Sequence, residues 1–461
     1  MADKRPALGP AAAGRRLPPG RHKHSREFVV RSQRDRMLDA MAQICAAQGY
    51  GGATADAVIA RAGVSSKTFY EQFKDREDCF LAAYDAILAQ FLGRVAAAYG
   101  QTEVQWPDRV RAAIEALLAF LASEPAFARM CVVEVLTAGE RALERYDAAI
   151  TALAGLLDEG RSLMRDPNAI PAGTAVDVIE GSAFLIREQI LAGRTQQLET
   201  LVPDLTYAAL VPYLGQHQAL RHAPPSWSTT SAKTITLPRP ADGISAPTHT
   251  PAEPPSTTRE RQQRWRQQAH RARRERILEA MIDTTAERGY HNTSLSDVSA
   301  RAGVARDTIR QQFGDKELLF IAAHDWLLRR LANYVVPAYQ QPGPWPQRIS
   351  RGLSALLTAI AYRPQGARVA IIEVLAAGPR AHERHLAAIE TFTPYLDRGR
   401  DETPLGHKLP PSLATIVAGG IAARIHQQVA TGRTSELDQL HPELLHHILV
   451  SYLGRARSAA D

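Results

Sequence analysis

Hydroxyl, ammonium and phenol groups are concentrated in residues 66–70, where the chain reads Ser-Lys-Thr-Phe-Tyr. Such groups can bond to the phosphate oxygens and base edges of DNA. Phe69 and Phe73 are four residues apart and share one face of any helix formed here, so the polar side chains must point the other way. That outer face is typical of a helix that enters the major groove, and equally of an ordinary solvated helix. It is made by Ser66, Lys67, Thr68 and Tyr70.

The chain contains this arrangement twice. Residues 61–64 (Arg-Ala-Gly-Val) recur 240 positions later as residues 301–304. Residues 193–195 (Gly-Arg-Thr) recur 239 positions later as residues 432–434. A register held over about 190 residues means duplicated domains, since solenoid repeats are much shorter. The second outer face is made by Arg306, Asp307, Thr308 and Arg310, with Ile309 and Phe313 turned inward.

Three helices are expected to position each outer face. Apolar residues recur at helical intervals over residues 34–48, and Gly49 should end that helix. A short second helix should begin after Thr54 as its N-cap, and a third should cover residues 65–73. Gly63 lies between these two helices, where a sharp turn requires a positive φ.

The second copy repeats these signals. Gly289 should end its first helix, and Gly303 should make the turn before the third. Ser294 should begin the second helix, and Asp297, three residues later, predicts a capping box.

Basic residues are concentrated just ahead of the first helix in both copies. Because the run occupies the same place twice, beside the polar helix, phosphate binding explains it better than solubility does. The residues are Arg15, Arg16, Arg21, Lys23, Arg26, Arg31, Arg34 and Arg36 in the first copy, and Arg259, Arg261, Arg264, Arg266, Arg271, Arg273, Arg274 and Arg276 in the second.

Length and composition limit the number of domains and the class of protein. A chain of 461 residues needs at least two cores, and a 45% apolar and 22% charged composition is ordinary for a globular protein. The net charge of +7 is a weak indication of an anionic partner. Cys45, Cys79 and Cys131 are odd in number and form no CxxC pair, so a reducing cytoplasm fits. We find no signal peptide and no stretch of about 20 apolar residues, and expect a cytoplasmic, nucleoid-associated protein without membrane contact.

The segment from Thr54 to Glu77 resembles the DNA-binding signature of the TetR family. The resemblance implies an all-α fold in which a three-helix helix-turn-helix head precedes a helical ligand-binding and dimerisation domain. It also implies a protein that binds double-stranded DNA, usually represses transcription, and leaves DNA when a small molecule binds. The matching residues are Thr54, Ile59-Ala60 and the run Ala62-Gly63-Val64-Ser65-Ser66-Lys67-Thr68-Phe69-Tyr70-Glu71-Gln72-Phe73-Lys74-Asp75-Arg76-Glu77.

The same resemblance implies which residues face DNA, with Tyr70 on a phosphate and Arg76 near one at the start of the fourth helix, where backbone N–H groups favour anions. In the first copy they are Thr54, Ser65, Ser66, Lys67, Thr68, Tyr70, Lys74 and Arg76. In the second copy they are Ser294, Arg306, Thr308, Arg310 and Lys316.

The second copy departs from the family pattern. Ala305 removes a helix N-cap that stabilises by about 1 kcal/mol, while Arg310 could bind a phosphate or a guanine. The second head therefore either binds DNA or is a degenerate copy kept for packing. The replacements, first copy to second, are Ser65 to Ala305, Phe69-Tyr70 to Ile309-Arg310, Lys74 to Gly314 and Arg76 to Lys316.

The predicted organisation is two tandem units joined by a Pro-, Ser- and Thr-rich linker. In order, we expect a basic disordered arm over 1–26, a first head over 27–85, a regulatory domain over 86–216, the linker over 217–262, a second head over 263–325 and a second regulatory domain over 326–457.

The last two helices of each regulatory domain, around residues 176–192 and 205–214 in the first copy, resemble the family's dimerisation helices. The two copies could therefore pair within one chain as a pseudo-dimer, which would read an asymmetric operator because its two outer faces differ. The alternative is a homodimer of fused chains with four heads.

Other functions are less well supported. The sequence has no Gly-rich phosphate loop, GxSxG, HExxH or Cys/His pair, so we predict no enzyme and no cofactor. Glu134 and Glu373 lie in apolar runs and could bind a polar ligand group, although a helix-surface or paired carboxylate is more common. We predict no metal site from His382, His385, His441, His446 and His447. The effector pocket and effector are not readable, and a non-DNA interaction protein on a retired scaffold is the remaining alternative.

Overall fold

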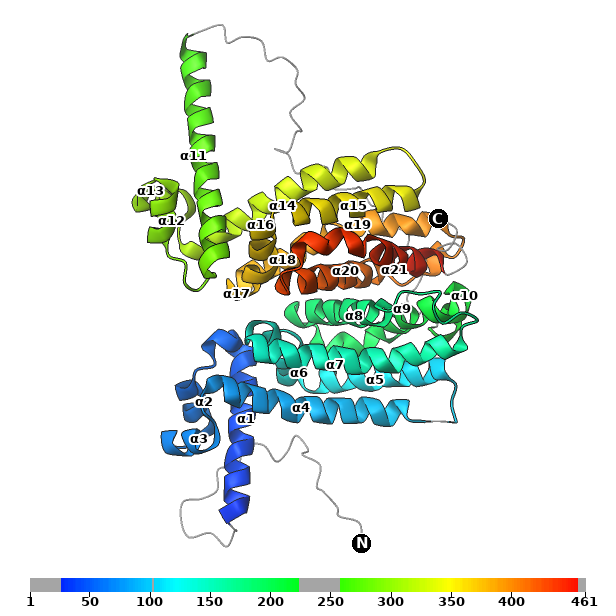
Figure 1. The fold of residues 1–461 in the computed structure, drawn as a ribbon. Helices are drawn as coiled ribbons and strands as arrows, with labels where there is room; N and C mark the ends of the chain where they lie inside the picture. The colour runs from blue at the N-terminus through cyan, green and yellow to red at the C-terminus, as the bar shows by residue number, and fades with distance from the viewer. Residues whose placement is uncertain (1–25, 102, 224–257, 455–461) are drawn as a thin grey trace. The chain divides into compact units, whose positions relative to one another are not determined.

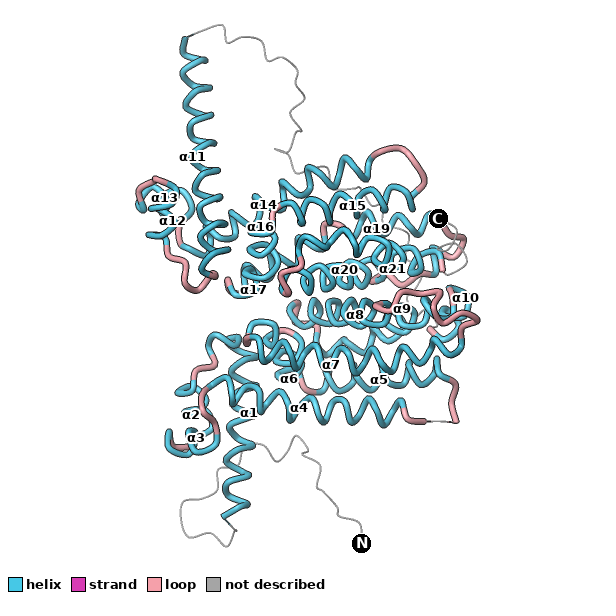
Figure 2. Tube along the Cα trace, in the orientation of Figure 1, coloured by secondary structure: helices cyan, strands magenta, loops and turns pink. Residues whose placement is uncertain are grey.

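The computed structural model describes residues 26–101, 103–223 and 258–454, and every element among them is helical (Figure 1). Figure 2 shows helices joined by loops, with no strand in these three segments. The all-α prediction is confirmed. It follows from the spacing of apolar residues at helical intervals in both copies.

The helices of the first copy begin with a head of three, α1 (Arg26–Gly52), α2 (Ala55–Ala62) and α3 (Ser66–Gln72). The rest of the copy comprises α4 (Arg76–Tyr99), α5 (Trp106–Ser123), α6 (Pro125–Val132), η1 (Glu134–Thr137), α7 (Glu140–Asp158), η2 (Glu159–Leu163), α8 (Thr174–Leu191), η3 (Thr195–Leu201), α9 (Val202–Leu214) and α10 (Gln216–His222).

The second copy has the same order, and its head consists of α11 (Thr258–Arg288), α12 (Leu295–Ala302) and α13 (Arg306–Phe313). After it come α14 (Lys316–Gln340), α15 (Trp345–Tyr362), α16 (Pro364–Arg368), η4 (Val369–Glu373), α17 (Val374–Ala376), α18 (Pro379–Glu390), α19 (Thr393–Asp397), η5 (Arg398–Glu402), η6 (Gly406–Lys408), α20 (Leu413–Ala430), η7 (Thr434–Leu440) and α21 (His441–Leu453).

The first helix of each head is longer than predicted. The helix expected over residues 34–48 begins at Arg26, and its counterpart begins at Thr258, so described basic residues lie on the helices and not ahead of them. The extra turns of α11 are rich in Arg, Gln and Glu, which are good helix formers, and residues 262–268 are all exposed, so apolar periodicity could not reveal them. Gly49, with φ of 71°, ends the regular part of α1 as predicted.

The linker is shorter than predicted at both ends. The expected linker over 217–262 contains most of α10 and the first residues of α11. Ala219 of α10 is fully buried, and α10 packs on α21, so burial stabilises a helix too short to show periodicity. Residues 224–257 of the linker, and residues 1–25 of the predicted basic arm, lie outside the described residues.

The chain divides into two compact units that do not coincide with the two sequence copies. The first unit takes residues 1–156 and 186–202, and the second takes residues 157–185 and 203–461. The predicted regulatory domain over 86–216 is therefore not one compact body. Residues 157–185 and 203–216 belong to the same unit as the second copy, where Gly181 of α8 approaches Ile416 and Tyr207 of α9 donates to the Ser451 carbonyl. No local pattern encodes these contacts.

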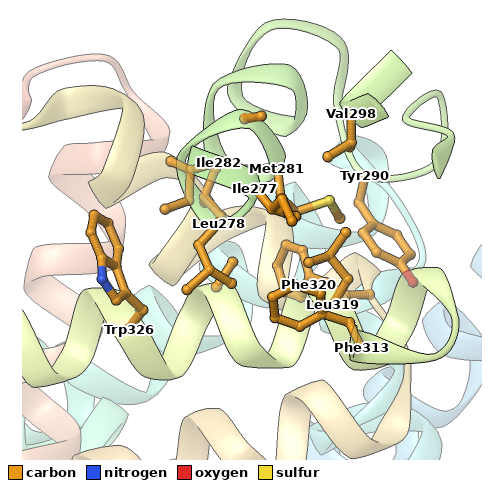
Figure 3. Close-up of a cluster of buried hydrophobic side chains, with 14 of the residues drawn as sticks. Ile277, Leu278, Met281, Ile282, Tyr290, Val298, Phe313, Leu319, Phe320 and Trp326 are labelled. Atoms are coloured by element: carbon orange, nitrogen blue, oxygen red, sulfur yellow. The ribbon is translucent and has the colours of Figure 1, made fainter. Parts of the chain in front are cut away.

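A cluster of buried apolar side chains holds the second head (Figure 3), and it extends to Val369, Val374 and Ala381 in the helices behind the head. Ile277 and Met281 of α11 are fully buried, and Phe313 of α13 and Phe320 of α14 complete the cluster. Truncating a buried aromatic side chain of this kind costs about 3–5 kcal/mol. This packing fixes the orientation of α13 within the head, and therefore the direction in which its outer face points.

Helix α4 is long and apolar enough to cross a membrane by length and composition alone, and the bent pair formed by α5 with α6 and η1 passes the same test. The prediction that no stretch approaches this length is wrong by that measure. In the structure α4 packs against α1, α5 and α6, and Phe80, Ala83 and Tyr84 are buried there.

Candidate nucleic-acid interface

Helix α3 buries one face and exposes the other. Phe69 and Phe73 are buried with ring centroids 5.5 Å apart, while the side chain of Tyr70 is 57% exposed. Ser66 and Lys67 are exposed and Thr68 is half-buried. The predicted division of the helix is confirmed, so the phenol, the ammonium group and the hydroxyls of this face are open to a ligand.

Two of the predicted contact residues also cap helices. The Ser65 hydroxyl accepts a hydrogen bond from the backbone N–H of Thr68 at 3.1 Å, and the Thr54 hydroxyl accepts one from the N–H of Ala57 at 3.2 Å. Both residues are exposed. Their hydroxyls hold the starts of α3 and α2, as the N-cap prediction for Thr54 required.

Helix α13 presents a different outer face on the same frame. Ile309 is fully buried, Arg306 and Arg310 are exposed, and Thr308 is half-buried. Ala305 at the N-cap makes no side-chain hydrogen bond, so the predicted loss of the cap is confirmed. Before it, Ser294 and Asp297 form the predicted capping box of α12.

The turns that aim the third helices are the same in both heads. Gly63 and Gly303 each have φ of 62°, in the left-handed region that the sequence predicted. Gly314, which replaces the exposed Lys74, has φ of 87° and ends α13 after Phe313.

The basic residues that begin α4 and α14 lie over tyrosine rings. The Arg76 guanidinium is 4.7 Å from the ring centroid of Tyr50, and the Lys316 ammonium is 4.1 Å from that of Tyr290. The Lys316 ammonium also donates to the Tyr290 carbonyl at 3.0 Å. Each charge is held at a helix N-terminus, where backbone N–H groups also favour an anion.

The arginines of α1 and α11 fall into two groups. Arg34 stacks on Phe73 and Arg274 on Phe313, each at 4.6 Å, while Arg36 donates to the Ala62 carbonyl at 2.9 Å, so these side chains brace the heads. The remaining described side chains are exposed and free to meet phosphates. They are Arg31 on α1, and Arg259, Arg264, Arg266, Arg271, Arg273 and Arg276 on α11, with the exposed Trp265 among them.

The model of the family "Bacterial regulatory proteins, tetR family" matches residues 37–83 and again residues 277–323. Each match runs from the first helix of a head into the helix that follows its outer face. Both heads belong to the tetR family. The chain carries the family's helix-turn-helix head twice, as the sequence predicted.

Curated relatives cover one part of the chain. The HTH-type transcriptional regulator RutR of Escherichia coli strain K12 is 29% identical over 117 residues, which is 25% of this chain and 53% of RutR. RutR of Shigella flexneri gives the same figures. The chain thus spans about half the length of the curated relatives it matches.

Solved structures of similar proteins cover more of their own length. The fatty acid degradation regulator FadR of Bacillus halodurans has 18% identity and a TM-score of 0.34, covering 38% of this chain and 97% of FadR. FadR of Bacillus subtilis, solved in complex with stearoyl-CoA, has 18% identity and a TM-score of 0.33 over the same shares.

A buried glutamate joins each tetR-family head to the helices behind it. The backbone N–H of Tyr50 donates to Glu134 Oε2 at 2.8 Å, and Arg129 Nε donates to Glu134 Oε1 at 3.0 Å. A Cβ on Gly49 would lie 3.3 Å from Glu134 Oε2, so the approach favours glycine as well as the positive φ. We call the Glu134–Tyr50 hydrogen bond the head contact.

The second copy repeats the head contact. The N–H of Tyr290 donates to Glu373 Oε2 at 2.8 Å, and Arg368 Nη2 lies 3.2 Å from Glu373 Oε1. Of the two sequence hypotheses for these glutamates, the structure supports the paired carboxylate. The backbone N–H groups that they accept from lie 84 and 83 residues away, which no spacing rule predicts.

The second regulatory domain contains a cavity of about 1030 Å³. Its wall is mainly apolar, and three arginines, Arg330, Arg351 and Arg363, lie among the lining residues. Sequence reasoning missed it, because cavity-lining and core-forming residues share the same apolar helical pattern. Apolar lining residues include Leu331, Val335, Leu353, Phe392 and Ile421.

Metal binding and thiol chemistry have little support among the described residues. There, no three His, Cys, Asp or Glu side chains lie together as they would around a metal ion. Burial raises the pKa of the Cys45, Cys79 and Cys131 thiols to about 12, so these thiols stay protonated at neutral pH.

Proposed function

We propose that this chain is a transcription regulator that binds DNA through both heads and is released by a small molecule. The observation that carries the proposal is the exposed outer face of α3, in which the exposed side chains of Lys67 and Tyr70 lie beside the fully buried Phe69. Exposed arginines on α1 and α11 supply the positive charge that phosphates require. Repression is the expected direction, since a protein bound over a promoter excludes polymerase.

Within this proposal the chain acts as a pseudo-dimer on an asymmetric operator. A two-fold dimer with identical reading helices selects a palindrome. Here Lys67 and Tyr70 of α3 are replaced by Asp307 and Arg310 of α13, and different side chains prefer different base edges. The two half-sites should therefore differ in sequence.

The effector is expected to be a mainly apolar molecule that occupies the cavity of the second regulatory domain. Leu331, Leu353 and Phe392 offer apolar contact, and the nearby arginines favour a ligand with an anionic end. The head contact at Glu373 lies on η4, which follows α16 after the lining residues Gly366 and Ala367. A ligand that moves these helices could thus tilt the second head.

Footprinting on the DNA upstream of the chain's own gene tests the DNA-binding proposal. Lys67→Ala with Tyr70→Phe should remove protection from one half-site, and Arg306→Ala with Arg310→Ala should remove it from the other. Arg111→Ala on α5, an exposed arginine outside both heads, is the matched control and should change neither. Equal loss over both halves would contradict the asymmetric reading, and no protection by the unmodified chain on upstream or selected random DNA would contradict DNA binding.

A cavity-filling variant tests the effector proposal separately. Leu353→Trp should abolish saturable binding of the fluorescent apolar anion anilinonaphthalene sulfonate without lowering DNA affinity. Equal binding of the probe by both proteins would place the ligand elsewhere.

Light scattering of the free protein tests the pseudo-dimer. A mass near 50.4 kDa fits one chain, whereas twice that mass would favour the four-headed homodimer.

A further inference from the structure

Helices α8 and α20 cross so closely that each needs glycine at the crossing. A Cβ on Gly181 would lie 2.1 Å from the carbonyl oxygen of Ile416, and one on Gly420 would lie 2.5 Å from that of Asp177. The repeat places Gly181 opposite Gly420 and Asp177 opposite Ile416, 239 positions apart. The contact is therefore reciprocal, as across a local two-fold axis between α8 and α20. All four residues belong to the second compact unit.

A buried ion pair breaks this symmetry. Asp177 is fully buried, and its Oδ1 lies 3.3 Å from Nε of Arg424, which also bonds Glu443 at 2.6 Å. On the other side of the axis the corresponding residues are Ile416 for Asp177 and Leu185 for Arg424, both buried and apolar. At these two positions, one copy of the contact has opposite charges and the other has apolar side chains.

The packing of Phe184 on Gly419 is a second difference between the two copies at this contact. A Cβ on Gly419 would lie 2.5 Å from Cβ of Phe184, so the phenyl group packs where only glycine leaves room. The counterpart residues are Ala423 for Phe184 and Glu180 for Gly419. Two first copies would therefore set Phe184 against Glu180, and two second copies would leave the space of the ring empty.

The charges at this contact also disfavour the pairing of two like copies. Pairing two first copies would bury Asp177 against Leu185 with no partner, and pairing two second copies would set Ile416 against Arg424 and leave that arginine only Glu443 of its own copy. A buried charge without its partner is strongly destabilising, while the matched pair need not add stability of its own. Such an arrangement selects a partner mainly by penalising the wrong ones.

We infer that this interface is heterotypic, so that the first regulatory domain accepts the second regulatory domain of its own chain and rejects a copy of itself. The covalent connection supplies a high effective concentration, and the Asp177–Arg424 pair with the Phe184–Gly419 fit supplies the selectivity. This pairing deepens the pseudo-dimer of the proposed function. Its test measures association and melting and not DNA binding, so either can fail alone.

The carboxyl group must be ionised for a clean test. Burial raises the pKa of Asp177 to about 7, with Glu443 and Glu180 acting in the same direction and Arg424 opposing them. At pH 8 Asp177 is mainly charged, and exchanging the two charges should then be tolerated, whereas reversing one should not.

The experiment exchanges the charges in the full-length chain at pH 8. Asp177→Arg and Arg424→Asp should each lower the melting temperature by roughly 10 °C, and the double variant should recover part of that loss, because the exchange also removes the partner of Glu443. Co-expressed with different tags, the two single variants should form a 1:1 dimer of twice 50.4 kDa, because each supplies the charge that the other lacks. Neither should dimerise alone.

The control makes the same exchange at Arg384 and Asp325, an ion pair of 2.7 Å inside the second copy, and should produce no mixed dimer. If a single variant fails to fold, the double variant still decides the question. A double variant no more stable than the singles, singles that melt like the unmodified chain, or singles that dimerise with themselves would overturn the inference.

Discussion

Phe69 and Tyr70 are neighbours in the chain, yet one is fully buried and the other is 57% exposed. A helix turns by about 100° per residue, so adjacent side chains can serve the core and a ligand separately. The two rings still touch edge to face, with centroids 5.2 Å apart. Tyr70→Phe keeps this contact and removes only the hydroxyl, which makes it a clean probe of DNA binding.

We therefore predict opposite outcomes for the two faces of α3. Tyr70→Phe and Lys67→Ala should each weaken DNA binding about tenfold, because each loses a charge-assisted bond, and leave melting unchanged. Phe73→Ala should lower the free energy of unfolding of the first head by about 3–5 kcal/mol. Fluorescence anisotropy with labelled operator and thermal denaturation measure the two effects. Melting data with the reverse ranking would contradict the face assignment.

A buried histidine gives the second copy a pH dependence of its own. Burial lowers the pKa of His324 to about 4, while the unfolded chain has the ordinary value near 6.5, so between these pH values the unfolded state holds more protons. The stability that neutral His324 contributes is present above pH 6.5 and is lost as the pH falls toward 4. We expect a loss of about 2 kcal/mol between pH 7.5 and pH 5.

Tyr84, which occupies this place in the first copy and is also buried, provides the matched variant. Urea unfolding of His324→Tyr at both pH values should show a smaller acid loss than the unmodified chain by that amount. Identical pH dependence in the two proteins would assign the acid sensitivity to other groups.

At the scale of elements, each head meets its regulatory helices through one backbone N–H and one buried carboxylate. Glu134 satisfies the Tyr50 N–H just after the left-handed Gly49, where α1 has no acceptor of its own. Tyr50 also packs edge to face on Phe80 at 5.0 Å, and Tyr290 packs on Phe320 at 5.1 Å. The end of the first helix is thus fixed by a polar and an aromatic contact in both copies.

Removing the carboxylate should loosen this junction. Glu134→Ala leaves the Tyr50 N–H and Arg129 without their acceptor, and should lower the free energy of unfolding of the first unit by about 1–3 kcal/mol. The Tyr50 amide should also exchange with deuterium faster. Glu115→Ala, which breaks an exposed pair with Arg111, is the control and should cost less than about 0.5 kcal/mol. Unchanged exchange at Tyr50 would show that the head contact does not hold the helix end.

At the scale of the whole molecule, positive charge is repeated at both heads. A protein that neutralises several phosphates releases their counterions, so the logarithm of its affinity falls with the logarithm of salt concentration by about 0.9 per phosphate. Alanine at both Arg271 and Arg273, which are exposed on α11, should make the slope shallower by up to about 1.8. Titrations at several salt concentrations measure it. A slope equal to that of the unmodified chain would show that these arginines do not meet phosphates.

Much of each head could be predicted from local residues. The spacing of Phe69 and Phe73, the capping pair Ser294 and Asp297 and the turn at Gly63 all act within a few residues of the chain. Their geometry is fixed by helix periodicity and by backbone sterics, which a sequence states directly. Because the repeat places the same signals 240 residues later, it also predicts the three helices of the second head.

Only the tertiary structure decided the rest, because it depends on residues that are distant in the chain. The Tyr50 N–H donates to a carboxylate 84 positions away. Arg34, which the sequence pattern placed among the phosphate-binding residues, instead stacks on Phe73 and packs within the head. Asp177 and Arg424 lie in different copies, and neither is recognisable alone as half of an ion pair. Helical periodicity tells which face is buried, whereas the partner of that face is chosen by the fold.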